Sequence, residues 1–301
     1  MTHALVIGEA LVDVVRREGE PEVAYAGGSA ANVAVALARL ERDVRFATCF
    51  AEDDYGALIA AQLSDSRVRL AVDPHTIGRT SSAIASIQPD GSAEYVFDLD
   101  WRPADPGEDV PLVIHTSSIG AVLEPGADTV LEVLERFAAR ASISYDINAR
   151  PSITGTGPEV IERVERLVSI ADVVKASDED FEALWPERSM SESLWALSEL
   201  GPAAVIATRG PQGVRFVAGG QEETAPAVPT SVADTIGAGD TFGAGLIDAL
   251  WQRDLLGAAR RDALAELTAQ EWVDPLHWAA RCAAITVSRP GADPPRRADL
   301  A

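Results

Sequence analysis

Short apolar runs alternate along most of this chain with longer segments of helical periodicity. The runs are typical of strands, for example "VRFATCF" at 44–50, "ISYDIN" at 143–148 and "AAVIATRG" at 203–210. The segments between them, such as "PEVIERVERLVSI" at 158–170, carry apolar residues three and four positions apart. Strands that alternate with helices predict a parallel sheet covered on both faces, so the expected fold class is a three-layer α/β/α domain.

Two segments break this alternation. Residues 12–26 and 80–101 alternate apolar and polar positions around Gly, Pro and Asp turns, a pattern of half-exposed hairpin strands. We expect the two segments to form one small sheet, inserted at two places into a single domain that spans 1–301.

Composition excludes several classes of function. With 47% hydrophobic residues, the 301 residues can bury a large core, and Asp plus Glu outnumber Lys plus Arg by 47 to 25. The formal net charge of −22 makes nucleic acid and anionic membrane surfaces unfavourable partners. The N-terminal residues lack the basic region of a signal peptide, so we expect a cytoplasmic protein. Cys49 and Cys282 are expected to be buried apolar residues.

The chain contains one lysine, Lys175, which follows "DVV". A P-loop needs a lysine after its glycines, so this architecture is excluded, and no G-x-G-x-x-G segment occurs. Nucleotide binding therefore requires a different architecture.

The stretch "DTIGAGDTF" at 234–242 places glycines and a carboxylate where a helical pattern begins. Gly237, Ala238 and Gly239 have almost no side chain, so their amides can approach an anion closely, and the helix dipole there favours negative charge. The stretch predicts an anion hole at the carboxyl ends of the strands. Asp240, taken alone, is explained equally well as a first-turn residue that complements the dipole.

Several segments together resemble the ribokinase/fructokinase (PfkB-type) family of sugar kinases, and the resemblance spans essentially the whole chain. In chain order they are "GGSAANVAVALARL" at 27–40, "YDINARP" at 145–151, "VKASDEDFEAL" at 174–184, "ATRGPQG" at 207–213, "DTIGAGDTFGAGL" at 234–246 and "AAITVSRPGA" at 283–292. The resemblance implies a ribokinase-like fold and ATP- and Mg²⁺-dependent phosphorylation of a small sugar or sugar acid. It also implies that 12–26 and 80–101 form a lid that closes over the sugar.

The resemblance assigns roles on the sugar side. Asp240 matches the base that accepts the proton of the sugar hydroxyl, and the amides of 237–239 stabilise charge on the transferred phosphoryl group. Phe97, Trp101 and Arg102 are the lid residues expected to decide which sugar binds. The remaining sugar-binding positions that the resemblance implies are Asp13, Gly27, Gly28, Asn32 and Arg150.

On the nucleotide side, the loop after 203–208 is expected to hold ATP phosphates and ribose through Thr208, Gly210 and Gly213, although a simple glycine turn explains it too. Arg209 either offsets the repulsion between ATP and the acidic chain or is an ordinary surface residue. The further implied positions are Asn148 and Ser177 near phosphate, Asp180 on Mg²⁺ through water, and Ala280 and Ala283 around adenine.

Alternatives remain open at this point. "GEALVD" and "SDED" favour a fructokinase or a 2-keto-3-deoxygluconate kinase over other members of the family. A non-catalytic sugar- or nucleotide-binding regulator on the same fold is the rival from another class. A sugar-phosphate kinase would need a cationic cluster, for which the candidates are Arg16, Arg17, Arg79 and Arg102.

Two further properties are predicted. A small sheet with an open edge or apolar face is expected to pair with a second copy, which gives a homodimer through the lid. "VADTIGAGD" resembles the loop that holds K⁺ in many relatives, with backbone carbonyls of Asp234 and Ile236 as ligands.

Overall fold

The computed structural model describes residues 2–17, 19–88 and 93–301. Their main sheet has nine strands in the order β13-β12-β11-β10-β9-β8-β1-β4-β5. The strands are β1 (Ala4–Ile7), β4 (Val44–Ala47), β5 (Arg69–Leu70), β8 (Val113–Ser117), β9 (Ser142–Asp146), β10 (Val173–Ser177), β11 (Ala204–Thr208), β12 (Val214–Ala218) and β13 (Gln221–Ala225). Every pair from β5 to β11 is parallel, which confirms the predicted fold class.

The main sheet is mostly parallel, as the resemblance implies, but the sequence did not locate the antiparallel strands at one edge. β12 pairs with β11 and β13 in antiparallel fashion, and Ala218 lies opposite Gln221. Gly219 and Gly220 form the two-residue turn between them, with φ of 56° and 70°. Positive φ at both positions is the geometry that this tightest hairpin turn demands, so the Gly-Gly pair was the overlooked signal.

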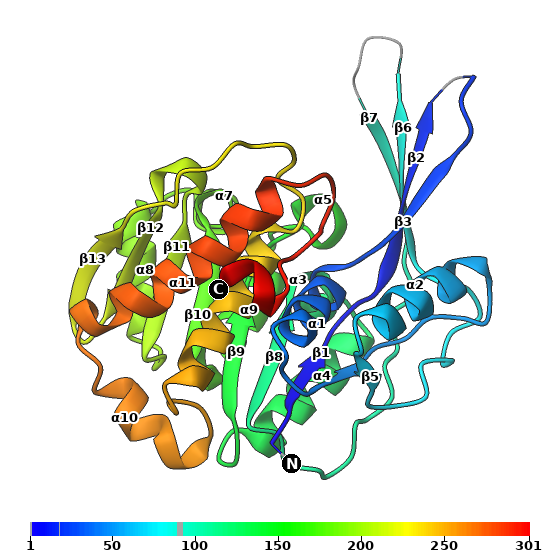
Figure 1. Ribbon diagram of the computed structural model, residues 1–301. Helices are drawn as coiled ribbons and strands as arrows, with labels where there is room; N and C mark the ends of the chain where they lie inside the picture. The colour runs from blue at the N-terminus through cyan, green and yellow to red at the C-terminus, as the bar shows by residue number, and fades with distance from the viewer. Residues whose placement is uncertain (1, 18, 89–92) are drawn as a thin grey trace.

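Helices cover both faces of the main sheet (Figure 1). Alternate residues of a strand point to opposite faces, and in β10 Val173 packs into one core while Val174 packs into the other. The first core lies under α1, α9 and α11, and the second under α4, α6 and α8. The helices are α1 (Ser29–Arg39), α2 (Asp54–Asp65), α3 (Ser118–Val122), α4 (Gly126–Phe137), α5 (Pro151–Thr154), α6 (Pro158–Ile170), α7 (Asp178–Leu184), α8 (Met190–Ser198), α9 (Ala238–Gln252), α10 (Arg261–Ala265) and α11 (Ala269–Val287).

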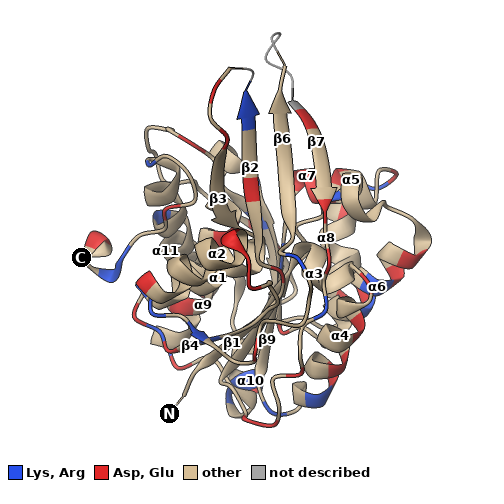
Figure 2. Cartoon of the chain, turned by 90° about the vertical axis from the view of Figure 1, so that its right-hand side faces the viewer, with Lys and Arg blue, Asp and Glu red and all other residues tan. Residues whose placement is uncertain are grey.

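The small sheet joins the two inserted segments. Its order is β3 (Val23–Gly27), β2 (Leu11–Arg17), β6 (Ser82–Ile87) and β7 (Ala93–Asp98), and the parallel pair β2–β6 connects one segment to the other. The far ends of these strands project beyond the main body (Figure 1 and Figure 2). The parts of the expected lid at residues 18 and 89–92 lie outside the described residues.

The two faces of the small sheet differ. Asp13 is paired with Tyr25 and Ala83, and Ala83 with Phe97, so these side chains share one face. Val12 and Val14 point to the other face, where they join the core beside α2. The face of Asp13 and Tyr25 is therefore the one that the body leaves uncovered, for a ligand near the body and for other contacts farther out.

Cys49 and Cys282 are buried free thiols, as expected. None of the described helices combines the length and the hydropathy that a membrane span requires.

Candidate active site

A cleft of about 1170 Å³ lies where the lid meets the carboxyl ends of the central strands. Residues that end or follow β1, β8, β9, β10 and β11 line it, together with lid residues and the first turn of α9. Ligands of open α/β sheets bind at this edge, because the helix N-termini point their free amides there. The cleft exceeds the volume of a usual single-ligand pocket, so it has room for two substrates.

Asp240 lies in the first turn of α9 and is held through both carboxylate oxygens. Ser29 Oγ donates to Oδ1 at 2.7 Å, and Asn32 Nδ2 donates to Oδ2 at 2.8 Å. Only 8% of Asp240 is exposed, and burial raises the pKa of its carboxyl, while the bonds from Asn32 and Ser29 lower it. A carboxylate that is positioned in this way at a cleft is suited to accept a proton from a bound hydroxyl.

Gly237 shapes the start of α9. Its φ of 73° is in the left-handed region, and a methyl group there would lie 2.8 Å from Ala292 Cβ. Both constraints require glycine. Gly237, Ala238 and Gly239 all line the cleft, as the predicted anion hole requires.

A second buried carboxylate beneath Asp240 was not predicted. Glu9 Oε1 accepts a hydrogen bond from Ser29 N at 2.9 Å, and Oε2 accepts one from Gly120 N at 3.0 Å. Burial raises the pKa of Glu9 to about 7. Ser29 Oγ also lies 2.9 Å from Ser117 Oγ. The available signals were a carboxylate two residues after the first strand, in "VIGEAL", and a serine between Gly28 and Asn32.

The glycine pair at the end of β3 serves close backbone approaches. A methyl group at Gly27 would lie 2.4 Å from Asp13 Oδ2, and one at Gly28, whose φ is 101°, would lie 2.7 Å from Glu9 O. Gly28, Asp13 and Asn32 line the cleft, whereas Gly27 does not. Asp13 is exposed to the open cleft, yet the desolvation that its neighbours impose raises the pKa of its carboxyl, against the lowering effect of Arg150.

The three lid residues expected to select the sugar are separated by the structure. Phe97 lines the cleft. Trp101 is buried in the body of the protein, where its Nε1 donates to Gly120 O at 2.9 Å. Arg102 pairs with Asp100 at 2.7 Å and does not line the cleft. Of the three, only Phe97 is placed to contact a ligand in this cleft.

Almost all residues expected on the nucleotide side line the cleft. Its lining includes Asn148, Arg150, Ser177, Thr208, Gly210, Gly213, Ala280 and Ala283, and excludes Arg209. A methyl group at Gly213, whose φ is 81°, would lie 2.2 Å from Ala225 O, so the turn needs glycine for structural reasons. Asn148 (φ 38°) and Ser118 (φ 53°) also have positive φ and line the cleft, and such strain is common at ligand sites.

At the two expected metal positions, the side-chain carboxylates of Asp180 and Asp234 accept hydrogen bonds from backbone amides. Asp180 accepts from Ala149 N at 2.8 Å and from Ser177 N at 2.6 Å, so it links the first turn of α7 to the loop after β9. Asp234 accepts from Ile236 N and Gly291 N, and these bonds lower the pKa of its carboxyl. Asp180 and Ile236 line the cleft and Asp234 does not. Within the described ranges, no three His, Cys, Asp or Glu side chains gather as a metal centre.

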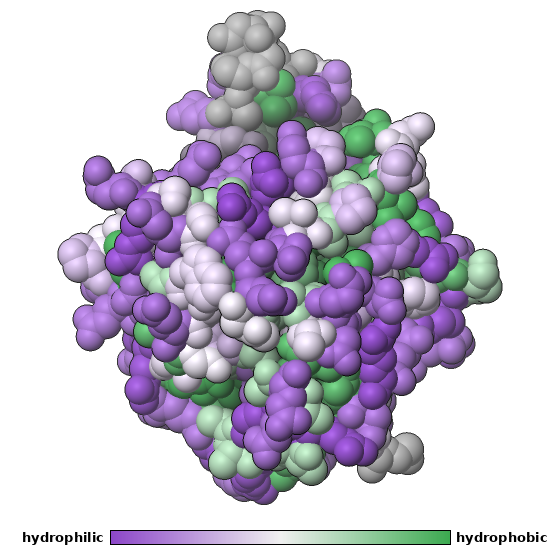
Figure 3. Space-filling view, turned by 90° about the vertical axis from the view of Figure 1, so that its left-hand side faces the viewer, coloured by the Kyte–Doolittle hydropathy of each residue, from purple (hydrophilic) through white to green (hydrophobic). Residues whose placement is uncertain are grey.

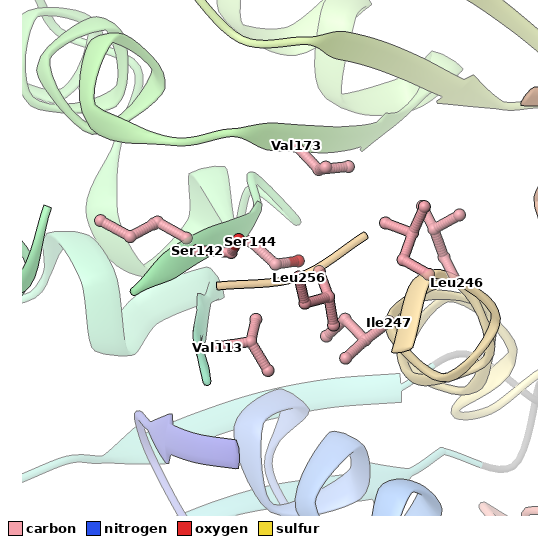
Figure 4. A pocket seen from close by; sticks show the side chains of 9 residues that line it. Val113, Ser142, Ser144, Val173, Leu246, Ile247 and Leu256 are labelled. Carbon is pink, nitrogen blue, oxygen red and sulfur yellow. The ribbon is translucent and has the colours of Figure 1, made fainter. Parts of the chain in front are cut away.

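A second cavity, of about 10 Å³, lies between α9 and the beginning of β8, β9 and β10 (Figure 4). Its walls are mainly apolar, with Val113, Val173, Leu246 and Ile247 around Ser144. It is a packing gap of about one water molecule and carries no ionisable side chain.

A model of the pfkB family of carbohydrate kinases matches residues 1–299. The chain belongs to this family. It is 32% identical over 287 residues to the fructokinase of Rhizobium leguminosarum bv. trifolii, which covers 90% of this chain and 86% of the relative. It is 29% identical over 280 residues to the aminoimidazole riboside kinase of Salmonella typhimurium, which covers 88% of each chain.

Solved structures agree with this assignment. A fructokinase from Xylella fastidiosa with bound ATP superposes with a TM-score of 0.85 at 25% identity, over 97% of this chain and 94% of that one. The predicted family, the ribokinase-like fold and the enzyme class are therefore confirmed, and this pfkB-family chain is a sugar kinase.

Proposed function

We propose that this pfkB-family kinase transfers the γ-phosphoryl group of ATP to a hydroxyl of a small sugar or sugar acid, with Asp240 as the base. The observation that carries the proposal is the placement of the Asp240 carboxylate, which is buried at the first turn of α9 and fixed through both oxygens. The ATP-bound fructokinase among the structural relatives supports ATP as the donor.

In the proposed step, Asp240 takes the proton of the sugar hydroxyl as the hydroxyl oxygen bonds to the γ-phosphorus. The bond from this phosphorus to the oxygen that bridges to the β-phosphate breaks, and its electron pair leaves on ADP. The amides of 237–239 face the charge that develops on the phosphoryl oxygens. Because burial raises the pKa of Asp240, this carboxylate accepts the proton more readily than an exposed one.

The two substrates are assigned to opposite ends of the cleft. The sugar is proposed to bind beneath the lid, among Asp13, Asn32 and Phe97, and the nucleotide along the loops after β9, β10 and β11. The wall formed by Ala280 and Ala283 is apolar and suits the face of an adenine ring. Mg²⁺ would bind together with the ATP phosphates and contact Asp180 through a water molecule. The ion would neutralise part of the phosphate charge.

The cationic side chains near the lid favour a sugar without a phosphate group. Each of the four candidate arginines has a carboxylate partner, and none lines the cleft: Arg16 pairs with Glu22, Arg17 with Glu20, Arg79 with Asp98 and Arg102 with Asp100. Arg150 does line the cleft, and its positive charge acts to lower the pKa of Asp13. This position suits a ketose such as fructose or the carboxylate of a sugar acid such as 2-keto-3-deoxygluconate.

The test is ADP release from ATP over a panel of ketoses, aldoses, sugar acids, nucleosides and sugar phosphates. We expect turnover with fructose or a 2-keto sugar acid and little with sugar phosphates. Preference for a sugar phosphate would contradict the argument from the four paired arginines. Binding of sugar and ATP without turnover across the whole panel would favour the non-catalytic regulator.

K⁺ activation is proposed through the loop of Asp234 and Ile236. The Asp234 carboxylate orders this loop by accepting hydrogen bonds from Ile236 N and Gly291 N. An ordered loop holds its backbone carbonyls in fixed directions, as an ion site requires. We expect a severalfold higher rate in KCl than in a salt of a bulky organic cation at equal ionic strength. Equal rates would remove the ion from the proposal without affecting the role of Asp240.

Association through the lid completes the proposal. The lid face that carries Tyr25 and Tyr95 exposes 58% and 59% of these residues, and a second copy of the chain is proposed to cover this face. The cytoplasmic location stays a prediction.

A further inference from the structure

The single lysine of the chain lies inside the candidate active site. Lys175 is on β10, and its Nζ donates to Asp146 Oδ2 on the neighbouring strand β9 at 2.8 Å. The side chain of Lys175 is 7% exposed and that of Asp146 is 2% exposed. Both strands end at the cleft, and Lys175 is part of its lining.

The ammonium group of Lys175 adjoins the predicted anion hole. A methyl group at Gly239 would lie 3.4 Å from Lys175 Nζ. The ammonium group therefore lies close to the backbone of Gly239, with no side chain between them. An ammonium group has three N–H donors, and within the described residues Asp146 receives the one hydrogen bond that Lys175 makes. The charge of Lys175 also acts on His115 of β8: burial together with this charge lowers the pKa of His115 to about 3. The remaining donors of Lys175 are therefore available on the side of the cleft.

The cleft needs a cation at this point. Six acidic residues line it, namely Glu9, Asp13, Asp178, Glu179, Asp180 and Asp240, against Arg150 and Lys175. The guanidinium of Arg150 is exposed and donates to the backbone carbonyls of Asn148 and Ala149. Lys175 is thus the buried cation of the cleft, where a charge is screened least and stabilises a developing anion most.

We propose that Lys175 is a catalytic residue whose ammonium donates a hydrogen bond to an oxygen of the transferring phosphoryl group, beside the amide of Gly239. This inference rests on the proposed function. The ammonium keeps its proton throughout, and the hydroxyl proton still goes to Asp240. Asp146 is a positioning residue that aims the ammonium at the cleft.

The first test compares three variants. Lys175→Met removes the ammonium but leaves Asp146 buried without its partner, since Asp146 Oδ1 makes no hydrogen bond among the described residues. The double variant Lys175→Met/Asp146→Asn removes both charges and avoids this instability. We expect kcat to fall about a hundredfold or more in both, with the KM for sugar nearly unchanged, because removing one such donor costs about 10²- to 10³-fold. Asp146→Asn alone keeps the ammonium and should cost less than about tenfold.

A purely structural pair gives a different pattern. If the two charges only join β9 to β10, Asp146→Asn should be as damaging as Lys175→Met, and the double variant should recover most of the wild-type rate. That recovery would overturn the proposal.

The second test needs no turnover. Reductive methylation with formaldehyde and a borohydride reductant modifies amines, and because the sequence holds one lysine, the modified lysine peptide reports on residue 175 alone. We expect Lys175 to react in the nucleotide-free protein, and a non-hydrolysable ATP analogue to slow this reaction at least about tenfold, with AMP slowing it much less. Resistance of Lys175 in the folded, nucleotide-free protein, or equal protection by AMP, would contradict an ammonium open to the γ-phosphate.

The two tests separate the inference from the proposed function. Failure of the wild type to phosphorylate any sugar contradicts the proposed function, whatever the methylation shows. Turnover by the wild type together with near-normal kcat in the double variant contradicts the role of Lys175 alone.

Discussion

The main sheet and the lid sheet expose their apolar residues to very different extents. Helices cover both faces of the main sheet, and its edge strand β13 carries Gln221, Glu222 and Glu223, on a side of the molecule that is mainly hydrophilic (Figure 3). The lid sheet leaves Tyr25, Tyr95 and Val96 more than half exposed. Polar edges prevent sheets from pairing, whereas exposed apolar faces favour contact with a partner or a ligand.

This difference separates two tasks. Asp240 and the residues that hold it depend on α1, α9 and the strands of the closed body, so folding alone fixes their geometry. Asp13 and Phe97 are on the lid, which has few body contacts beyond α2, so a ligand or a second copy has more influence on their position. We therefore expect substitutions in the body to change kcat and substitutions on the lid to change association and substrate affinity.

The largest expected effect comes from Asp240→Asn in the body. A positioned general base contributes about 10²- to 10⁴-fold, so kcat should fall at least about a hundredfold while ATP and sugar still bind. The free energy of unfolding at neutral pH should hold or rise, because the folded-state pKa of Asp240 is raised. The ionised carboxylate then costs folding free energy as pH rises through that pKa, and asparagine removes this cost.

Steady-state kinetics and thermal unfolding of the same samples measure the two effects. If Asp240 only complements the helix dipole, the variant should lose roughly 0.3 to 1 kcal/mol of stability and keep its rate. That outcome would contradict the proposed mechanism, because the base would then have to be another residue.

The next effect concerns the lid. Tyr95 stacks on Phe97 at 6.0 Å between ring centroids, on the face expected to meet a second copy. Tyr95→Ser should weaken the dimer at least about thirtyfold, since an interface tyrosine often contributes 2 kcal/mol or more. Sedimentation over a range of concentrations measures this change, and kcat at saturating sugar should stay within about threefold.

Val96→Ser is the matched control, because Val96 is similarly exposed and points to the opposite face of the same strand. Equal weakening by both variants would contradict a specific role for the Tyr95 face. A wild-type protein that is monomeric at high micromolar concentration would remove the dimer from the proposal altogether.

The sequence predicted the parts of this molecule that depend on neighbours in the chain. The alternation of strands and helices is a local pattern, and "GAGD" places the anion hole and Asp240 within four consecutive residues. The support beneath Asp240 was not predictable in this way, because Ser29 and Asp240 are 211 positions apart and meet only when α1 packs against α9. The prediction that Trp101 is a lid residue was wrong for the same reason. Its alternation with polar neighbours resembles a lid strand, but its ring is buried against Gly126 in the body.

A smaller effect is expected from Gly237→Ala in the body. A left-handed φ costs a residue with a side chain about 1 to 2 kcal/mol, and the new methyl group would crowd Ala292. Thermal unfolding should show a loss of that size, and kcat should fall about tenfold as the amides of the anion hole shift.

Gly243→Ala is the control in the same helix: its methyl group would meet no atom within 4 Å, so stability should hold or rise slightly. Equal losses in both variants would contradict the role of the left-handed turn.

The smallest effect separates the support of Asp240 from the base itself. Ser29→Ala removes the donor to Asp240 Oδ1 but leaves Asn32 on Oδ2, so kcat at the optimum pH should fall only severalfold. The bond from Ser29 lowers the pKa of Asp240, so its loss should raise that pKa further. Because the base acts in its ionised form, the acid limb of the profile of kcat against pH should move to higher pH in the variant.

Ser117→Ala is the matched control, since Ser117 Oγ contacts Ser29 Oγ and makes no bond to Asp240. An acid limb that stays in place in Ser29→Ala, or moves equally in both variants, would show that the titrating group is not the carboxylate that Ser29 holds.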